Sequence, residues 1–294
     1  MRALVLLALL LAGNAAPSPA PVRVLFDDAH HNVHLSDGRY KPFVELARSA
    51  GFEVRPNPER FTPPALAGSD ILVIAGARGA APPAPLPERG RPAFTPEEAD
   101  AVRDWVKTGG GLLLITDHYP LGSANEILAS RFGVTMSNAW TDDPPKTDQS
   151  VGGLVFSREN GGLADHPVTE GAHRVATFTG QSLAGPPGSV PLLRFGKTAV
   201  DRLPPDQTQT TSAAGRAQGI ALEFGKGRVI VLGEAAMLTA GDGADQAGGI
   251  DKTGVDNRRL ALNGLRWLAG VPPPRPSPQP SPSPLPGRRE REPL

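Results

Sequence analysis

Acidic residues and histidines stand directly after three apolar stretches of the sequence, VRVLF (22–26), LLLI (112–115) and RVIVL (228–232). If these stretches are parallel strands, their carboxyl ends meet at one edge of a sheet, where such proteins bind ligands. Carboxylates beside imidazoles suit proton transfer or divalent metal binding, since both groups are available near neutral pH. The predicted catalytic residues are Asp117, His118 and Glu234, and the predicted ligand-binding residues are Asp27, Asp28, His30 and His31.

A purely structural role is the alternative for all seven, because Asp and His after a strand also cap loops and helices. His30, His31 and His34 match no specific metal-binding spacing, and we expect His34 to be solvated. A divalent metal therefore stays an open hypothesis. Ser123 lacks the Gly-x-Ser-x-Gly pattern of a nucleophile elbow, and we interpret it as a helix cap.

The segment from Phe94 to Pro120 predicts a helix, a glycine stop and a buried strand that ends near Asp117. Thr95 and Glu98 have the spacing of a capping box, and the apolar residues that follow recur at helical intervals. The glycines at 109–111 precede a strand, whereas a phosphate-binding glycine loop follows one, so they indicate helix termination. The unbroken apolar run at 112–115 is typical of a parallel strand covered on both faces.

The remaining pattern predicts one open, mostly parallel α/β sheet with helices on both faces and an antiparallel hairpin near its end. The hairpin signal is Gly225-Lys226-Gly227, a tight turn between two apolar runs. The proline-rich loop at 77–94 is expected to be disordered. Further strands are expected at 22–26, 52–55, 71–75, 174–178, 190–195, 219–224 and 228–232, and further helices at about 43–50, 123–132 and 256–269.

Both ends of the chain differ in composition from residues 21–270. Residues 1–20 have the pattern of a signal peptide, with Arg2 before a short apolar run, so we expect a periplasmic or secreted protein with no membrane span in its mature form. Residues 271–294 hold ten of the 33 prolines and predict a disordered tail. Without these ends the net charge is −3, which disfavours a nucleic-acid partner. There is no cysteine.

Residues 94–118, 225–238 and 256–270 resemble the class I glutamine amidotransferase-like superfamily, specifically its extracytoplasmic DUF4350-type branch, which is related to gliding-motility and intraflagellar-transport domains. The resemblance implies a flavodoxin-like domain and no settled activity. Working members carry a cysteine after the central strand and a His-x-Glu pair after a late strand. Here Asp117 and His118 stand at the first position, and Glu234 stands at the second without a histidine. Glutamine hydrolysis by that mechanism is therefore excluded.

Two hypotheses follow for the function. The first is a binding domain whose polar edge holds a polar small molecule, a glycan or an envelope protein. The second is a hydrolase, metal-assisted or using the Asp and His residues of the same edge as acid and base.

Overall fold

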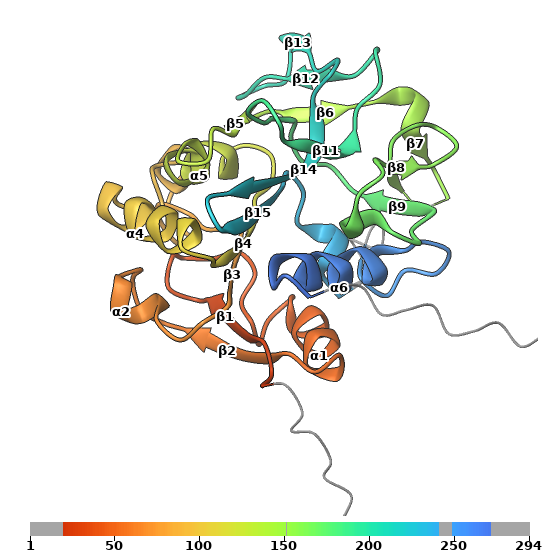
Figure 1. The fold of residues 1–294 in the computed structure, drawn as a ribbon. Coiled ribbons are helices and arrows are strands. Elements are labelled where there is room, and N and C mark those ends of the chain that lie inside the picture. Colours follow the sequence, from red (N-terminus) through yellow and green to blue (C-terminus); the bar gives the residue numbers. More distant parts are fainter. Residues whose placement is uncertain (1–19, 151, 241–248, 272–294) are drawn as a thin grey trace, which may run out of the picture.

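The computed structural model describes residues 20–150, 152–240 and 249–271. A nine-stranded sheet forms its centre, with the strand order β2-β1-β3-β4-β15-β14-β10-β5 and β11 also paired to β14 (Figure 1). The first five strands in this order are parallel to one another. Their bounds are Glu53–Asn57 (β2), Arg23–Asp27 (β1), Ile71–Ala75 (β3), Gly111–Ile115 (β4) and Gly227–Leu232 (β15).

The sheet continues with antiparallel strands. β14 (Ala217–Phe224) pairs with β15 through the predicted hairpin, in which Phe224 lies opposite Gly227. The other members are β11 (Val190–Arg194), β10 (Leu183–Ala184) and β5 (Thr135–Met136). The predicted flavodoxin-like α/β class with an antiparallel excursion is confirmed.

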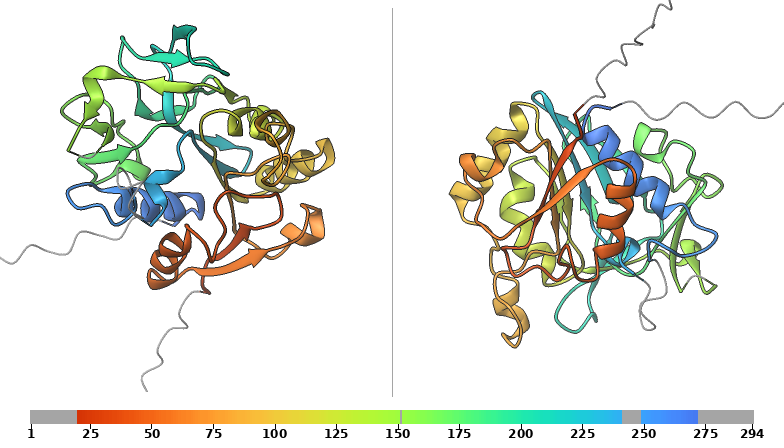
Figure 2. Two further views of the ribbon diagram at one scale, coloured as in Figure 1. Left: turned by 180° about the vertical axis from the view of Figure 1, so that it is seen from behind. Right: turned by 90° about the horizontal axis from the view of Figure 1, so that it is seen from below.

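Helices cover both faces of the sheet, and each face has its own apolar core (Figure 2). α1 (Lys41–Ser49) and α6 (Asn257–Leu268) pack on one face. α2 (Pro63–Leu66), α4 (Pro96–Lys107) and α5 (Leu121–Ser130) pack on the other. The apolar residues of β3 and β4 serve both cores, which explains why these strands are apolar without interruption.

The predicted central segment forms as expected. The Thr95 hydroxyl accepts the N–H of Glu98, and the Glu98 carboxylate accepts the N–H of Thr95, so the capping box at the start of α4 is complete. After the helix, Gly110 lies so close to the ring of Trp105 that a Cβ would come within 2.5 Å of it. A larger residue there would displace the tryptophan, so this glycine is required for packing.

Two small antiparallel sheets lie beside the main one. One contains β6 (Trp140–Asp142), β12 (Val200–Arg202) and β13 (Thr210–Ser212), and the other contains β7 (Thr147–Asp148), β8 (Gly153–Ser157) and β9 (Arg174–Thr177). Three 3-10 helices complete the described elements, namely η1 (Pro144–Lys146), η2 (Pro167–Thr169) and η3 (Ala236–Leu238).

Ser123 is not a helix cap, because α5 begins at Leu121 and the Ser123 hydroxyl donates to Pro120 O at 2.9 Å. Two further sequence expectations about local structure are wrong. The loop at 77–94 was expected to be disordered, but it holds the short helix α3 (Leu86–Arg89) and packs on the start of α5 through the hydrogen bond from Ala93 N to Ala124 O, 2.9 Å. His34 was expected to be solvated, but it is buried and its ring stacks on Tyr40 with 4.8 Å between ring centroids. Both errors arise from tertiary contacts that local composition does not encode.

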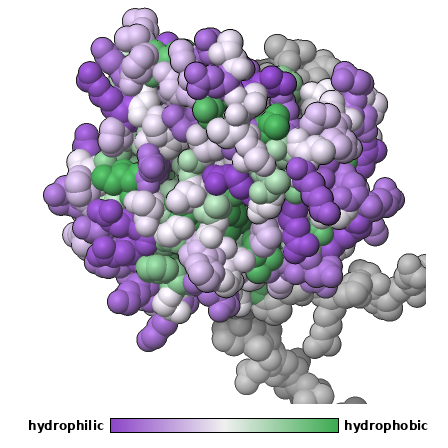
Figure 3. Space-filling model, turned by 90° about the horizontal axis from the view of Figure 1, so that it is seen from above, coloured by the Kyte–Doolittle hydropathy of each residue, from purple (hydrophilic) through white to green (hydrophobic). Residues whose placement is uncertain are grey.

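The surface in Figure 3 is mainly hydrophilic, with hydrophobic residues in separate small groups. Among the described residues, only Leu35, Leu86 and Val271 are large apolar side chains that are clearly exposed. In the same part of the chain, no helix combines the length and apolar character needed to cross a bilayer. The expected signal peptide and proline-rich tail lie outside the described residues.

Candidate functional site

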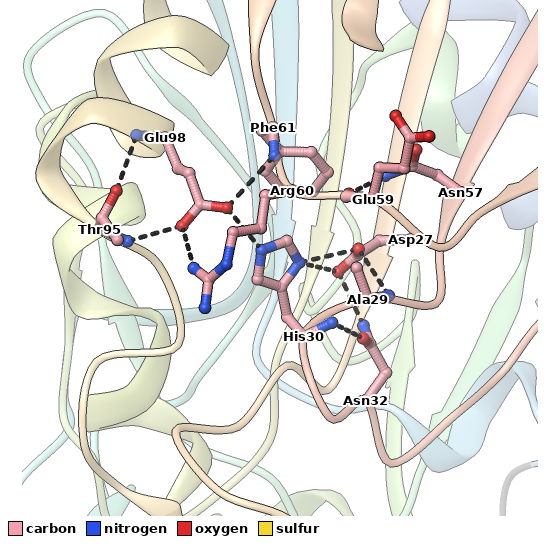
Figure 4. Close-up of polar contacts among 10 residues, drawn as sticks. All are labelled: Asp27, Ala29, His30, Asn32, Asn57, Glu59, Arg60, Phe61, Thr95 and Glu98. Atoms are coloured by element: carbon pink, nitrogen blue, oxygen red, sulfur yellow. Dashed lines mark hydrogen bonds and ion pairs between the residues drawn. The ribbon is translucent and has the colours of Figure 1, made fainter.

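His30 lies between two carboxylates at the end of β1 (Figure 4). Its Nδ1 is 2.8 Å from Asp27 Oδ1, and its Nε2 is 3.0 Å from Glu98 Oε1. An ionised carboxylate can only accept hydrogen bonds, so both ring nitrogens can donate only if His30 carries its positive charge. The geometry is therefore that of a buried imidazolium between two acceptors.

The surroundings of His30 close this cluster to solvent. The rings of Phe61 and Phe94 lie 4.6 and 4.8 Å from the imidazole, and His30 is only 4% exposed. Glu98 also accepts the N–H of Phe61 at 3.2 Å and pairs with Arg60 at 3.0 Å. The cluster thus joins the loop after β1 to the loop before α2 and to the start of α4, and it has the features of a structural tie.

The electrostatics of the cluster support the charged form. Burial alone would lower the pKa of His30, but the hydrogen bonds and charges of Asp27 and Glu98 outweigh it and raise that pKa. Burial likewise opposes ionisation of Glu98, yet the Thr95 N–H and the charged His30 lower its pKa. Each group therefore stabilises the ionised state of the other.

Asp28 and His31 do not join this cluster. Asp28 accepts hydrogen bonds from Ser36 N at 2.9 Å and from Ser36 Oγ at 2.6 Å, which fixes the following loop. Burial nevertheless raises the pKa of Asp28, against these two bonds. His31 is exposed, with a left-handed backbone φ of 49°.

A second group of acidic residues lies at the carboxyl ends of β4 and β15. Asp117 accepts the N–H of His118 at 2.7 Å and the N–H of Ala235 at 3.2 Å, so it links the ends of the two neighbouring strands. Glu234 is buried and accepts the N–H groups of Ala236 at 2.8 Å and Met237 at 2.9 Å. The side chain of Asp117 is 15% exposed, so of the two it is the one that reaches solvent.

Burial raises the pKa of Glu234 to about 8, and the charge of Asp117 adds to this increase. The backbone N–H groups that Glu234 accepts act in the opposite direction but do not offset burial. Near neutral pH Glu234 therefore keeps its proton. Tyr40 lies beside them and donates its hydroxyl to Ala235 O at 2.7 Å, and burial followed by the charge of Glu234 raises its pKa well above the ordinary value.

Aromatic rings flank Asp117. The imidazole of His118 stacks on Trp140 with 5.1 Å between centroids, and Tyr119 contacts the same indole at 5.8 Å. Gln181 holds the backbone on which these side chains stand. Its Nε2 donates to Asp117 O at 2.7 Å, and its Oε1 accepts from Asn138 N at 2.8 Å. Asp117, His118, Tyr119 and Trp140 thus form one polar and aromatic edge, which we call the Asp117 edge.

The seven residues predicted from the sequence therefore divide. Asp27 and His30 belong to the buried tie, Asp117 and Glu234 lie together with His118 next to them, and Asp28 and His31 stand apart. Their catalytic and ligand-binding roles stay predictions. Among the described residues, no three His, Asp or Glu side chains are placed to hold a metal ion.

Sequence reasoning missed four contributors, namely Glu98, Tyr40, Trp140 and Gln181. Glu98 had a local signal, but only as a cap, because its partner His30 is 68 positions away. Trp140 lay in a stretch without periodicity, and Tyr40 and Gln181 stood in loops. An isolated Trp in such a polar stretch is the one signal that could have indicated the Asp117 edge.

Comparisons with solved structures support the fold. The structure named mmIFT52 N-terminal domain is 16% identical and aligns over 84% of this chain and 96% of its own, with a TM-score of 0.60. The cytoplasmic protein STM3548 of Salmonella typhimurium is 13% identical and aligns over 84% and 98%, with a TM-score of 0.53. A protein of Thermoplasma acidophilum named for GMP synthase is 11% identical and aligns over 86% and 96%, with a TM-score of 0.49.

At these identities the likenesses show the fold alone. No family model matches the chain, and no curated protein matches it in sequence. The similar structures therefore support the mixed α/β fold, and the resemblance to the amidotransferase-like superfamily stays a prediction. The DUF4350-type branch stays a prediction.

Proposed function

We propose that this chain is an exported binding domain that holds a glycan or another polyhydroxylated small molecule at the Asp117 edge. The observation that carries the proposal is a partly exposed carboxylate next to three aromatic rings at the carboxyl ends of the parallel strands. Sugar rings have apolar C–H faces and hydroxyl edges, and they match a site that offers aromatic surface beside a hydrogen-bond acceptor.

Glu234 and Gln181 act as positioning residues in this proposal. Glu234 is 1% exposed and its oxygens accept backbone N–H groups, so it fixes the loop after β15 and does not itself face solvent. Gln181 holds the backbone of Asp117 and Asn138. A rigid edge of this kind binds with a smaller entropic cost than a flexible one.

Calorimetric titration of the purified domain with a panel of neutral and acidic oligosaccharides tests the proposal. We expect binding by the wild type and a loss of at least about tenfold in Asp117→Asn and in Trp140→Ala, corresponding to one charged hydrogen bond or one aromatic contact. Asp104→Asn is the control, because Asp104 is an exposed carboxylate on α4 paired with Arg103. Equal binding by all four proteins, or none by the wild type, would reject the proposal.

A hydrolase is the second candidate, and the raised pKa of Glu234 favours it specifically. A carboxyl group protonated near neutral pH beside a second carboxylate is the arrangement used for general acid catalysis. In that case Asp117, which reaches solvent, would act as the base or nucleophile, and the buried Glu234 would act on it through the interaction of their charges. Incubation with the bound oligosaccharide separates the candidates, because a binding domain returns it intact and a hydrolase yields shorter products at a rate that falls in Glu234→Gln.

Export is proposed from the sequence pattern of residues 1–20, of which all but the last lie outside the described residues. Intact-mass measurement of the protein from its native host should show loss of about 20 residues. A chain that keeps Arg2 would contradict export through a cleaved signal.

A further inference from the structure

Arg78 and Arg89 of the flap (residues 77–93) are near enough for their charges to interact, and neither forms an ion pair within the part of the chain that the structure describes. The beginning of the flap contacts its later part, because Gly79 N donates to Arg89 O at 2.9 Å. Gly79 permits this approach, since a Cβ there would come within 2.3 Å of Arg91 O. Arg78 and Arg89 are therefore brought together by the fold of the loop, and each side chain is half-buried.

Backbone carbonyl groups hold both guanidinium groups in place. Arg78 Nε donates to His31 O at 2.6 Å, and Arg89 Nε donates to Ala84 O at 2.6 Å. These bonds use one side of each planar group and leave other N–H donors for a further acceptor. Fixing two arginines in this way reduces the entropy that a ligand would otherwise have to remove.

Among the described residues, no carboxylate forms an ion pair with Arg78 or Arg89, and Glu88, the neighbour of Arg89 on α3, pairs with neither. This contrasts with Arg103 and Arg131, which both pair with Asp100. Burial, and after it the positive charge of Arg89, lowers the pKa of Arg78. Two like charges in a half-buried place are unfavourable, and an anion bound between them would relieve this cost.

The flap borders the Asp117 edge. Asn125 Nδ2 on α5 donates to Ala77 O at 3.0 Å, and Gly90 packs against Pro120 and Ser123 at the start of the same helix. In the right view of Figure 2, the gold helix α3 projects at the end of the molecule opposite to the two ends of the described chain. The two arginines therefore lie near the carboxyl ends of the parallel strands, as Asp117 does.

We propose that Arg78 and Arg89 bind the anionic group of an acidic carbohydrate, a uronate carboxylate or a sulfate ester. Both groups present coplanar or clustered oxygens that match the forked donors of arginine. The net charge of −3 in the core disfavours a polyphosphate backbone as the ligand. This inference rests on the proposed function for the carbohydrate and on the flap alone for the anion site.

The anion site is tested first, with inorganic sulfate as the probe. In NMR spectra of arginine side chains, sulfate should shift the Nη–H signals of Arg78 and Arg89 and leave those of Arg103 unchanged, because Arg103 is already paired with Asp100 and Asp104. Equal shifts at all three arginines, or none at Arg78 and Arg89, would overturn the anion site whatever the ligand of the domain is.

The ligand class is tested with three oligosaccharides of equal length, one neutral, one uronate and one sulfated. We expect the acidic members to bind at least about tenfold more tightly than the neutral one, and the double variant Arg78→Gln/Arg89→Gln to bind all three equally. Comparison of the affinities for the uronate and the sulfated oligosaccharide shows which of the two anionic groups is preferred. An unchanged preference in the double variant, or no preference in the wild type, overturns the proposal.

The two proposals fail separately. If sulfate shifts both arginines but no oligosaccharide binds, the anion site stands while the glycan function and the acidic-carbohydrate ligand are both rejected. If neutral and acidic oligosaccharides bind equally and depend on Asp117, the proposed function stands and the present inference is rejected.

Discussion

His30 has a carboxylate on each ring nitrogen, which makes its charge part of the folding free energy. The pKa of His30 is raised in the folded chain. A raised pKa means that the folded state binds the proton more tightly than the unfolded one. The stabilisation is therefore complete below the unfolded value of about 6.5 and is lost as pH rises through the folded pKa.

We accordingly predict that His30→Gln is destabilising by about 3 kcal/mol at pH 6, because it removes the cation from the buried Asp27 and leaves Glu98 with Arg60 alone. The difference from wild type should shrink as pH rises above the folded pKa of His30, since the wild type then loses the same charge. Urea unfolding at several pH values measures this. His173→Gln, at an exposed histidine, is the control and should show no difference. A deficit that stays constant up to pH 9 would contradict the charged tie.

The raised pKa of Glu234 leads to a second prediction, for how the free energy of unfolding depends on pH. Its pKa is about 8 in the folded chain and about 4.3 when unfolded, so its stabilisation is lost as pH rises through this window. The wild type should lose up to about 1.4 kcal/mol per pH unit from this group. Glu234→Gln should remove that slope, although its baseline stability is lower because an amide has only one oxygen to accept the N–H groups of Ala236 and Met237. An unchanged slope in the variant would show that Glu234 is ionised near neutral pH.

Asp117 is coupled to Glu234 by charge, which gives a third prediction. Asp117→Asn removes a negative charge next to Glu234, so the pKa of Glu234 should fall. The relief of repulsion offsets the weakened hydrogen bonds to His118 N and Ala235 N, and we expect a melting temperature equal to or above that of wild type. Carbon-13 NMR titration of the Glu side chains measures the pKa, with Asp104→Asn as the control. A clearly lower melting temperature with no change in the titration would identify Asp117 as a structural cap only.

At the scale of elements, the parts that could be predicted are those with local signals. Thr95 and Glu98 mark the start of α4, the run at 112–115 marks β4, and Gly225-Lys226-Gly227 marks the turn between β14 and β15. These signals depend on neighbours within a few positions. The strands at the centre of the sheet could also be predicted, because a strand buried on both faces needs apolar residues at every position.

The parts that could not be predicted depend on distant contacts. Two-residue strands such as β5 and β10 have no pattern of their own and exist because β10 pairs with β14 and β5 pairs with β10. The flap is ordered by contacts with α5, and His30 meets Glu98 across 68 positions. The sequence therefore predicted that acidic residues and histidines gather at one edge, but it could not show that they form two separate groups.

Glu98 connects a local cap with this distant contact, which gives a prediction for α4. Thr95→Ala removes the hydroxyl that accepts Glu98 N and loosens the side chain that holds His30. We expect a loss above the usual cost of about 1 kcal/mol for a cap. Thr62→Ala is the matched control, since Thr62 caps the short helix α2 through Ala65 N at 3.3 Å. Equal losses in urea unfolding would show that the cap and the tie are energetically independent.

At the scale of the whole molecule, the two ends of the described chain lie together and away from the Asp117 edge. Ala20 to Arg23 line a cavity of about 800 Å³ together with Leu268 and Ala269, at the amino ends of the parallel strands. The right view of Figure 2 shows both ends of the coloured chain on this side while α3 lies at the opposite one. The described chain thus begins and ends at the amino ends of the parallel strands, whereas the proposed ligand site lies at their carboxyl ends.

This arrangement predicts that changes at the carboxyl-terminal end and in the flap have different effects on ligand binding. Deleting residues 272–294, or fusing a second protein after Val271, should leave the melting temperature unchanged and the oligosaccharide Kd within about twofold of wild type, because so proline-rich a sequence has few apolar residues to bury in a core. Inserting a short Gly-Ser segment at residues 81–84 should instead weaken binding of acidic oligosaccharides, since it moves Arg89 away from Arg78 while leaving both cores intact. Calorimetric titration of the three proteins with the same uronate oligosaccharide checks this. Weaker binding by the fusion than by the flap insertion would place the ligand at the amino edge of the sheet, on the side of Trp105 and Ala20.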